Sequence, residues 1–506
     1  MLLSNEIDKF NPQSSFLKNQ HQTNILEDWM NKFILVYHQL VQELDRSKIK
    51  ININSVSNIK SNPIENIILQ LIEKGILDYD KSENLPTELL KDLHKIFNNQ
   101  KKTKKKTNKH MNSRTSEWFN KYNNEIYYGE NGKISFIQFL KSRKNINNTN
   151  NDVLVNQLLE HLEKYNMFTS FNIQTDLNKG FKYEYTYSDN ELEFKIFSNK
   201  NIPLNNLYWN FLYARMKSIP RLYKKENHKV KFKILLTEQL KEIPRKNKLF
   251  GPEEVNSGST DYTNITIWRK EEHFKVILHE SIHFFNLDGT YDLSHQNDNI
   301  DLKCHFQIDD NVKTRIYESY TESLAVFLNT FANAYQIFYM NHYNSNIDPR
   351  NIILTKKDLL DMYQIKNKLW IQEKKFFLLQ IAKIFIHINP KSNNFADFLV
   401  DTKNCQISRQ QSEHKLHQTT SLLSYHIIKG ANIIFDKDFL IWLKNPFDPH
   451  PKSLYKFADY ILPKTKDQIF IDLVNKTITY LKISNIKISK TLKNTLRMTS
   501  YETNFF

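Results

Sequence analysis

The sequence predicts an α+β fold, with a small mixed sheet in the middle of the chain and helices before and after it. Segments 181–187 and 191–197 alternate apolar and polar residues around Ser188, Asp189 and Asn190, which predicts a β-hairpin. Segments 230–236 and 263–268 alternate in the same way and predict two further strands. Elsewhere apolar residues recur at intervals of three and four, the period of an amphipathic helix.

The predicted helices lie on both sides of these strands. Apolar periodicity predicts helices over 25–44 and 64–77, and another over 204–217 that ends before Pro220. Downstream it predicts helices over 271–285, 312–343, 356–386, 419–429 and 467–481. Shifts in composition then divide the chain into five expected regions. They are a helical N-terminal domain (1–97), a basic flexible linker (98–116), a helical segment (117–165), an α+β core (166–345) and a helical C-terminal subdomain that closes a cleft (346–506).

Cysteine usage and the first residues predict a reducing compartment. The chain of 506 residues has two cysteines, Cys304 and Cys405, far apart and in no CxxC pattern, so neither a disulfide framework nor a thiolate metal site is expected. The opening MLLSNEIDKF has acidic residues where a signal peptide needs an apolar core. The run 376–388 is interrupted by Gln380 and Lys383 and is too short to span a bilayer. We therefore expect a cytoplasmic protein, not secreted and without a membrane segment.

The formal net charge of +16 raises the question of a polyanionic partner. Part of the excess lies in the tract KKTKKKTNKH (101–110), which has neither aromatic residues for base stacking nor apolar periodicity for helix packing. The tract therefore predicts a solvated linker. Weak attraction of a polyanion to Lys101–Lys109 is the other interpretation.

The segment FKVILHESIHFFN (274–286) contains the pattern HExxH. Two histidines four residues apart on a helix project from one face, so His279 and His283 can direct their imidazole nitrogens at one zinc ion at about 2.0–2.1 Å. Glu280 then lies next to the metal and can accept a proton from a water whose pKa zinc lowers. Apolar residues from Val276 to Phe285 frame the motif, as a helix packed in a core requires. The alternative is two histidines on an ordinary core helix.

A catalytic zinc site needs a third protein ligand. Asn286 and Gly289 stand where the metzincin pattern HExxHxxGxxH has its glycine and third histidine, so that subclass is excluded. In the apolar segment that follows, Glu318 and Glu322 lie one helical turn apart. Two stacked carboxylates in an apolar helix repel each other and resist burial unless a cation or donor lies opposite them. A zinc ion with its histidines supplies that partner, whereas a solvated helix face is the alternative.

These residues resemble the gluzincin metallopeptidases, the thermolysin-like group, whose third ligand is a glutamate in a pattern similar to E-G-[FL]-[AT]-E. The segment ESYTE (318–322) is similar to that pattern, with Ser319 in place of the glycine. The resemblance implies a thermolysin-like core binding one Zn²⁺, with Glu318 as third ligand and Glu322 as the carboxylate that orients a zinc-bound histidine. The exchanged assignment of the two glutamates stays open.

A second resemblance covers roughly residues 245–330. The segment GPEEVNSG (251–258) and the following TNITIWRKEEHFKVILHESIH are similar to uncharacterised zinc-peptidase-like proteins of large DNA viruses. The gluzincin resemblance also implies a strand that pairs with extended substrate, here residues Asn264, Ile265, Thr266, Ile267 and Trp268, with an ordinary half-buried strand as the alternative. It further implies a C-terminal donor to the oxyanion of the tetrahedral intermediate, for which Tyr425 and His426 are the candidates. Packing against neighbouring helices is the alternative for both.

The function predicted from these observations is zinc-dependent hydrolysis of peptide bonds in a peptide or protein substrate, with Glu280 as the base. One competing hypothesis is a catalytically inactive metallopeptidase-like binding or structural protein associated with a virion. Retention of both histidines and of Glu280 argues against it. A nucleic-acid-associated protein that uses the Lys tract is another hypothesis. The viral resemblance implies the host cytoplasm or the virion as the location.

Overall fold

The computed structural model describes residues 24–53, 180–225, 228–244, 250–261, 263–288, 305–306, 315–343, 348–399, 421–444, 447, 455–483 and 490–501. The chain divides into two compact units, one formed by Met1–Ser55 with Phe181–Phe506 and the other by Val56–Gly180. Every element described below belongs to the first unit. The helix expected over 64–77, the basic linker and the helical segment 117–165 lie outside the described residues.

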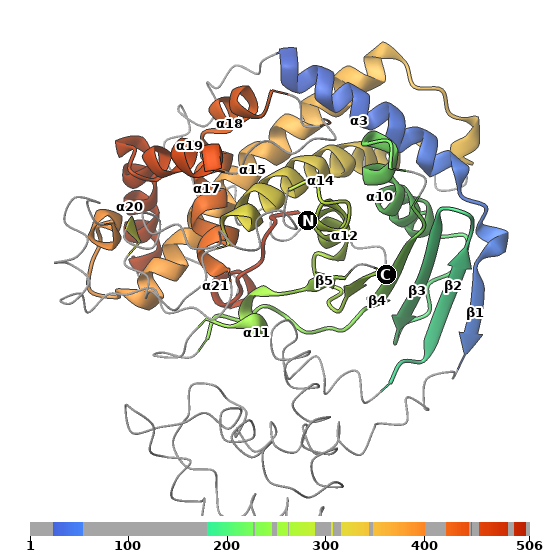
Figure 1. Ribbon diagram of the computed structural model, residues 1–506, viewed down its shortest axis with the longest axis horizontal. Helices are drawn as coiled ribbons and strands as arrows, with labels where there is room; N and C mark the ends of the chain where they lie inside the picture. Colours follow the sequence, from blue (N-terminus) through green and yellow to red (C-terminus); the bar gives the residue numbers. More distant parts are fainter. Residues whose placement is uncertain are drawn as a thin grey trace, which may run out of the picture. The chain divides into compact units, whose positions relative to one another are not determined.

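A six-stranded mixed sheet confirms the α+β class (Figure 1). The strands follow the spatial order β1 (Lys50–Ile53), β2 (Tyr183–Ser188), β3 (Leu192–Ser198), β4 (Val230–Leu235), β6 (Asn264–Ile267) and β5 (Gly258–Thr260). The antiparallel β2–β3 pair is the predicted hairpin, with Tyr187 opposite Phe194. The parallel neighbours β3, β4 and β6 form the middle, and β5 returns antiparallel to β6.

Alternating burial along the strands explains how the helices cover the sheet. Leu192, Phe194 and Ile196 of β3 are buried, whereas Lys195 between them is exposed. Phe194 stacks on Trp209 of helix α10 (Tyr208–Leu222), with ring centroids 6.3 Å apart. This helix connects the parallel strands β3 and β4, as parallel pairing requires. It does not end before Pro220 as predicted. Pro220 lies in its last turn, where the lost backbone donor costs a single helical hydrogen bond.

Helix α3 (Asn24–Glu43) packs on α10 and on α14 (Ile316–His342), so the expected N-terminal domain 1–97 is wrong for these residues. Arg215 of α10 is fully buried and donates from Nη1 to the hydroxyl oxygen of Tyr37, 2.6 Å away. The hydroxyl of Tyr37 in turn donates to the carbonyl oxygen of Phe211 at 3.1 Å. The apolar face of α3 thus packs against α10 and α14 and does not form a core of its own.

The remaining helices form the part of the fold next to α14 (Figure 1). The predictions over 271–285, 312–343, 356–386 and 467–481 are confirmed with shifted ends, whereas 419–429 begins as a π-helix. Short elements that were not predicted include β1, β5, α11, α18, α19 and α21. The bounds are α11 (Pro252–Val255), α12 (His273–Phe284), α15 (Lys356–Ile388), the π-helix η6 (Leu423–Ile428), α17 (Lys429–Ile434), α18 (Asp436–Leu443), α19 (Tyr455–Thr465), α20 (Gln468–Lys482) and α21 (Lys490–Asn494); single 3₁₀ turns are η1 (Arg46–Lys48), η3 (Pro349–Asn351) and η4 (Phe395–Phe398).

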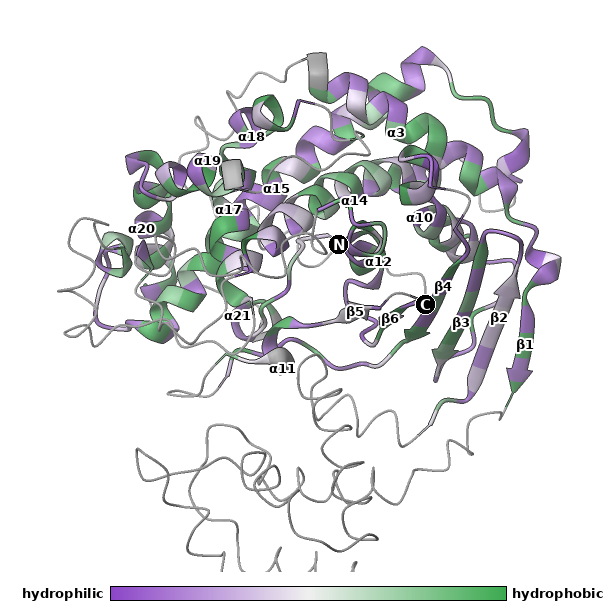
Figure 2. Ribbon diagram, in the orientation of Figure 1, coloured by the Kyte–Doolittle hydropathy of each residue, from purple (hydrophilic) through white to green (hydrophobic). Residues whose placement is uncertain are grey.

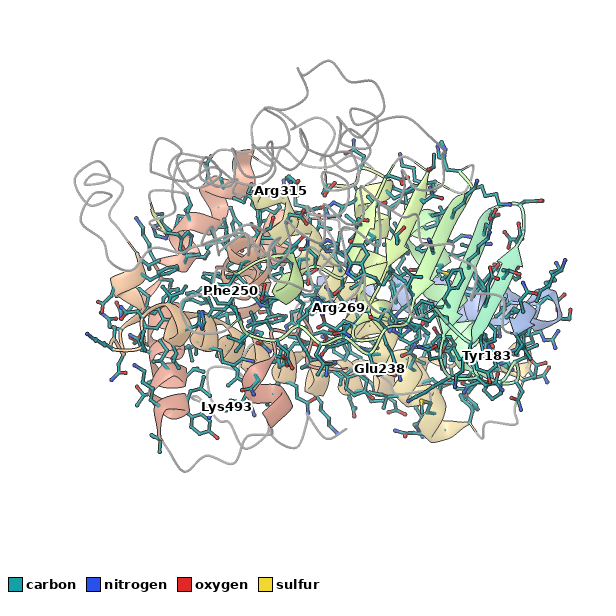
Figure 3. The ribbon with its side chains drawn as sticks, turned by 90° about the horizontal axis from the view of Figure 1, so that it is seen from below. Tyr183, Glu238, Phe250, Arg269, Arg315 and Lys493 are labelled. Atoms are coloured by element: carbon teal, nitrogen blue, oxygen red, sulfur yellow. The ribbon has the colours of Figure 1, made fainter. Side chains whose placement is uncertain are left out.

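Helices α12 and α14 carry long hydrophobic stretches, as Figure 2 shows, and their side chains join one core that extends from the sheet to the C-terminal helices. Figure 3 shows Arg269 amid the packed side chains, and this buried residue donates from Nε to the carbonyl oxygen of Asn256 at 3.0 Å. Among the described residues, no helix is both long enough and apolar enough to cross a membrane.

Strand β6 lies inside the sheet, and this corrects the predicted substrate strand. Ile265, Thr266 and Ile267 pair with β4 on one side and with β5 on the other. Asn264 pairs with Lys231 of β4, and Trp268 is buried beyond the end of the strand. An extended peptide cannot add to a strand whose two edges are both occupied. Strand β5 is the edge strand on this side of the described sheet.

Candidate metal centre

Helix α12 presents His279 and His283 from one face and is buried along nearly its whole length. Residues in the left-handed conformation stand at both of its ends, Glu272 with φ 63° and Asn286 with φ 52°. At the first end the carboxylate of Glu272 is buried and accepts from Nζ of Lys241 at 2.7 Å. A buried ion pair thus stands at the first turn of the helix.

Three donor atoms converge beside this helix. Nε2 of His279 and Nε2 of His283 are 3.0 Å apart, and Oε2 of Glu318 lies 3.4 Å from the first and 3.1 Å from the second. Ligands at zinc's usual distances in a tetrahedral site are about 3.3 Å from one another. Among the described residues, His279, His283 and Glu318 form the one group of this kind that could hold a metal ion. The predicted triad is brought together, and its spacing fits a small tetrahedral cation.

The outer nitrogen of each histidine ring faces a second carboxylate. Nδ1 of His279 lies 2.6 Å from Oε2 of Glu322, and Nδ1 of His283 donates to Oδ2 of Asp288 at 2.5 Å. Asp288 also accepts from the hydroxyl of Thr321 at 2.8 Å. A ring that donates from Nδ1 keeps Nε2 free as a metal ligand. The geometry therefore places Glu318 with the donor atoms and Glu322 behind His279.

Asp288 was not predicted as part of the site. It lies five residues after His283, and the chain reaches it by leaving α12 through the left-handed Asn286. This turn brings its carboxylate back to the ring, where it is fully buried. The sequence signal was an acidic residue soon after the predicted helix stop.

The charges of the buried cluster are compatible with a bound cation. Burial alone disfavours a charged imidazole, but the carboxylates of Asp288 and Glu318 outweigh it and raise the pKa of His283 well above its usual value. Burial would raise the pKa of Glu318, yet His283 and His279 lower it far below the ordinary range. Each group thus favours the charged state of its neighbours. A bound cation would satisfy the same carboxylate while leaving both rings neutral.

Glu280 stands beside the donor atoms without serving as one of them. Burial raises the pKa of its carboxyl group, and the two histidines oppose this rise without cancelling it. His279, Glu280, His283 and Glu318 retain 5%, 6%, 8% and 6% exposure, whereas Glu322 and Asp288 behind them have none. The donor residues and Glu280 therefore keep a slight exposure to solvent, whereas the two carboxylates behind them have none.

The π-helix η6 places the ring of Tyr425 beside His279, whereas His426 lies near Lys429. The ring of Tyr425 lies 5.9 Å from the ring of His279, and burial together with Glu318 and Glu280 raises the pKa of its phenol well above the usual value. His426 is fully buried near Lys429, and burial lowers its pKa well below the usual value. Short π-helical segments of this kind are common at functional sites.

The N-terminal turn of α14 adds two more side chains that sequence reasoning missed. The rings of Tyr317 and His283 form a T-shaped pair, with centroids 6.0 Å apart. Arg315, half-buried and marked in Figure 3, precedes Glu318 by one turn. Burial lowers the pKa of its guanidinium, but the nearby Tyr317 and Glu318 outweigh burial, so the pKa is raised overall.

Comparison of the chain with protein-family models, curated proteins and solved structures finds no match.

Proposed function

We propose that the chain is a zinc-dependent peptidase whose metal ligands are His279, His283 and Glu318. The observation that carries the proposal is the donor triangle of 3.0, 3.1 and 3.4 Å, with Glu280 next to its first ligand on the same helix. Two imidazoles and one carboxylate with an open fourth position are the donor set of catalytic zinc. A bound zinc ion would supply a Lewis acid and lower the pKa of a coordinated water toward about 7.

Glu280 is the proposed base of the reaction. Its carboxylate accepts a proton from the water that attacks the scissile carbonyl and returns this proton to the leaving amine, so that one side chain serves both half-reactions. Asp288 and Glu322 keep the two histidine rings in the orientation the site requires. Tyr425 is the proposed donor to the oxyanion, because its phenol stays protonated and its ring lies 5.9 Å from the ring of His279.

Strand β5 supports an extended peptide as the substrate class. Its residues are half-buried, it pairs with β6 through one edge, and no described strand pairs with the other. Gly258 of this strand lies so close to α12 that a Cβ there would stand 2.8 Å from Oε1 of Glu280. A peptide that adds to the free edge of β5 is therefore brought alongside the base. The earlier assignment of this role to residues 264–268 is replaced.

Metal analysis of the purified protein beside Glu280→Gln tests the proposal. We expect about one zinc per chain in both, because Glu280 is not a ligand. Cleavage of a quenched fluorescent peptide library should fall by at least about 100-fold in the variant, the usual contribution of a general base. Wild-type protein without zinc, or equal cleavage by the two proteins, contradicts the proposal. Zinc in both with cleavage in neither would instead support a metal-binding protein that is not a peptidase.

A further inference from the structure

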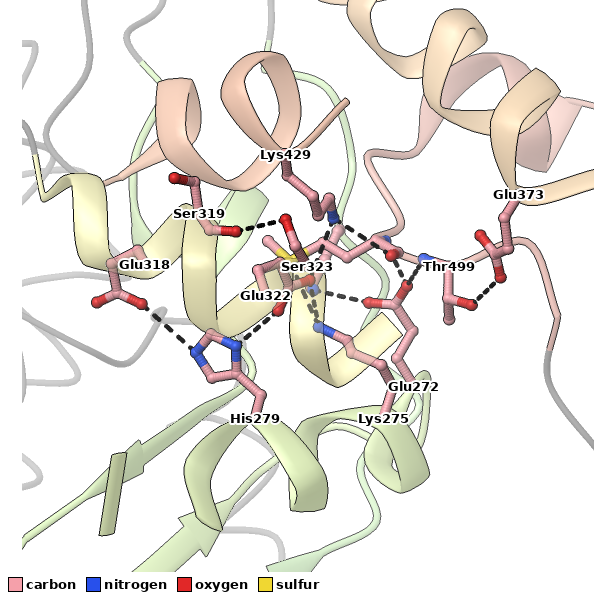
Figure 4. Close-up of polar contacts among 12 residues, drawn as sticks. Glu272, Lys275, His279, Glu318, Ser319, Glu322, Ser323, Glu373, Lys429 and Thr499 are labelled. Atoms are coloured by element: carbon pink, nitrogen blue, oxygen red, sulfur yellow. Dashed lines mark hydrogen bonds and ion pairs between the residues drawn. The ribbon is translucent and has the colours of Figure 1, made fainter. Parts of the chain in front are cut away.

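The orientation of the His279 ring depends on how Glu322 is held. Glu322 is fully buried on α14 and uses its two carboxylate oxygens for different partners. Oε2 faces His279, whereas Oε1 accepts from Nζ of Lys275 at 2.6 Å and from Nζ of Lys429 at 3.2 Å (Figure 4). Lys275 belongs to α12, the helix of the ligands, and Lys429 begins α17, far along the chain. Two lysines on different helices thus hold one carboxylate.

Residues 497–500, which we call the C-terminal strap, connect both lysines to the start of α12. Nζ of Lys429 donates to the carbonyl oxygen of Met498 at 3.4 Å, and Nζ of Lys275 lies 3.8 Å from its Sδ. The backbone N–H groups of Met498 and Thr499 donate to the carboxylate of Glu272, the residue that precedes α12. The strap is buried, and its backbone bonds fix where the two ammonium groups lie.

A second carboxylate anchors the strap from the other side. Glu373 of α15 accepts from the hydroxyl of Thr499 at 2.5 Å and from the backbone N–H of Ser500 at 3.1 Å (Figure 4). The chain of contacts therefore runs from α15 through the strap to the lysines, and from them through Glu322 to His279. Each step is a direct contact between buried groups. His279 is the one member of this chain of contacts that belongs to the donor triangle.

We propose that Lys275 and Lys429 are positioning residues of the metal centre, which set the His279 ring by holding Glu322 in place, and that the C-terminal strap locks the two lysines. This inference rests on the proposed metal centre. Without one lysine, Oε1 of Glu322 loses a charged donor in a site that water does not reach. The carboxylate then shifts toward its remaining partner and no longer aligns Nδ1 of His279.

A network that only stabilises the fold would behave differently. Loss of a buried ion pair lowers stability wherever the pair lies. Lys374 and Asp436 form such a pair, 2.8 Å apart and largely buried, with no contact to the donor triangle. Lys374→Met is therefore a matched control for Lys429→Met, because each removes one buried ammonium group and leaves a carboxylate behind.

The test measures zinc dissociation constants of the full chain by competition with a chelator, together with the visible spectrum of the cobalt-loaded protein. We expect Lys429→Met and Lys275→Met to weaken zinc binding by about 10–100-fold and to alter the cobalt spectrum. Lys374→Met should unfold at lower temperature with unchanged zinc affinity and spectrum. Lys275→Met, on α12, provides the test if Lys429→Met does not fold.

Double substitution separates the proposed route from a general loss of packing. If Lys429 acts through Glu322, the variant Glu322→Gln/Lys429→Met should bind zinc about as weakly as Glu322→Gln alone. Losses that multiply, or wild-type affinity in both lysine variants, overturn the positioning role while leaving the metal centre intact. Wild-type protein that binds no zinc overturns both the metal centre and this inference, so the two failures are distinguishable.

Discussion

Gly258 and Glu280 are in such close contact that a single methyl group does not fit between them. A Cβ on Gly258 would stand 2.8 Å from Oε1 of Glu280 and 2.8 Å from Cγ1 of Val276. The edge strand β5 and the ligand helix α12 can approach this closely because residue 258 has no side chain. The approach brings the edge strand of the described sheet next to the proposed base.

Gly258→Ala should therefore lower activity more than stability. The added methyl displaces either the Glu280 carboxylate or the strand, and a misplacement of about 1 Å at a reacting group can cost on the order of 100-fold in rate. We expect kcat/KM for peptide cleavage to fall by about 10–100-fold at unchanged zinc content. Ala458→Val, which adds methyl groups at a buried position of α19, is the control: it should lower the melting temperature but not kcat/KM. Equal effects of the two variants on kcat/KM contradict the prediction.

Asp288→Asn should weaken zinc binding without removing a ligand. The amide of asparagine accepts a weaker hydrogen bond from Nδ1 of His283 and can present its NH₂ group to the ring instead. A loss of about 10–100-fold in zinc affinity is expected, as for other carboxylates that orient a metal-bound histidine. Asp189→Asn, which alters a carboxylate that accepts from the backbone of Leu192 in the β2–β3 turn, should leave zinc affinity unchanged. The prediction is wrong if chelator competition ranks the two variants equally.

Tyr425→Phe should reduce kcat and leave KM nearly unchanged. A donor that acts only on the oxyanion stabilises the transition state and not the bound substrate, and removal of such a donor costs about 100–1,000-fold in kcat. Tyr460→Phe is the matched control, because the Tyr460 hydroxyl is buried and finds no hydrogen-bond partner among the described residues. Steady-state kinetics of both variants decide the point. A rise in KM alone would assign Tyr425 to substrate binding.

The candidate ligands could be predicted from sequence because helical spacing reduces them to two histidines and two glutamates. His279 and His283 share a face by periodicity, and Glu318 and Glu322 are distinguished only by which donor atom each one meets. The choice between these glutamates depends on the rotation of α14 relative to α12, a tertiary property that no local pattern encodes. The hairpin, the longer helices and the α+β class were predicted for the same reason, since hydrophobic period is a local signal.

What the sequence did not reveal are contacts between distant segments. Strand β5 has three residues and no alternation to detect, so the strand next to it was assigned its role at the edge. Lys429 and Met498 have no motif around them, and their relation to Glu322 exists only after α14, α17 and the C-terminal strap have packed. Helix α3 looked like part of a separate domain because its apolar face does not reveal which partner covers it.

A single buried lysine far from the metal centre provides the last prediction. Lys366 of α15 lies with Nζ 4.5 Å from the ring centroid of Tyr363 and has no hydrogen-bond acceptor among the described residues. Burial lowers its pKa to about 7, although Asp436 opposes the shift. In the unfolded chain the lysine titrates near about 10.4. Below about pH 7 the folded state therefore holds an unfavourable charge, and this cost disappears as the pH rises toward about 10.

Lys366→Met should consequently stabilise the protein at acidic and neutral pH but not at alkaline pH. The methionine keeps the apolar stem and removes the charge, so the free energy of unfolding should rise by about 3 kcal/mol near pH 6. Between about pH 7 and pH 10 the unfolded wild type binds a proton that the folded one does not, so wild-type stability increases with pH and the gain shrinks by up to about 1.4 kcal/mol per pH unit. Urea unfolding of both proteins across this range measures the difference. Lys374→Met removes the ammonium group paired with Asp436 and should lower the free energy of unfolding at every pH in the range. If the gain for Lys366→Met does not change with pH, packing and not charge is responsible for it.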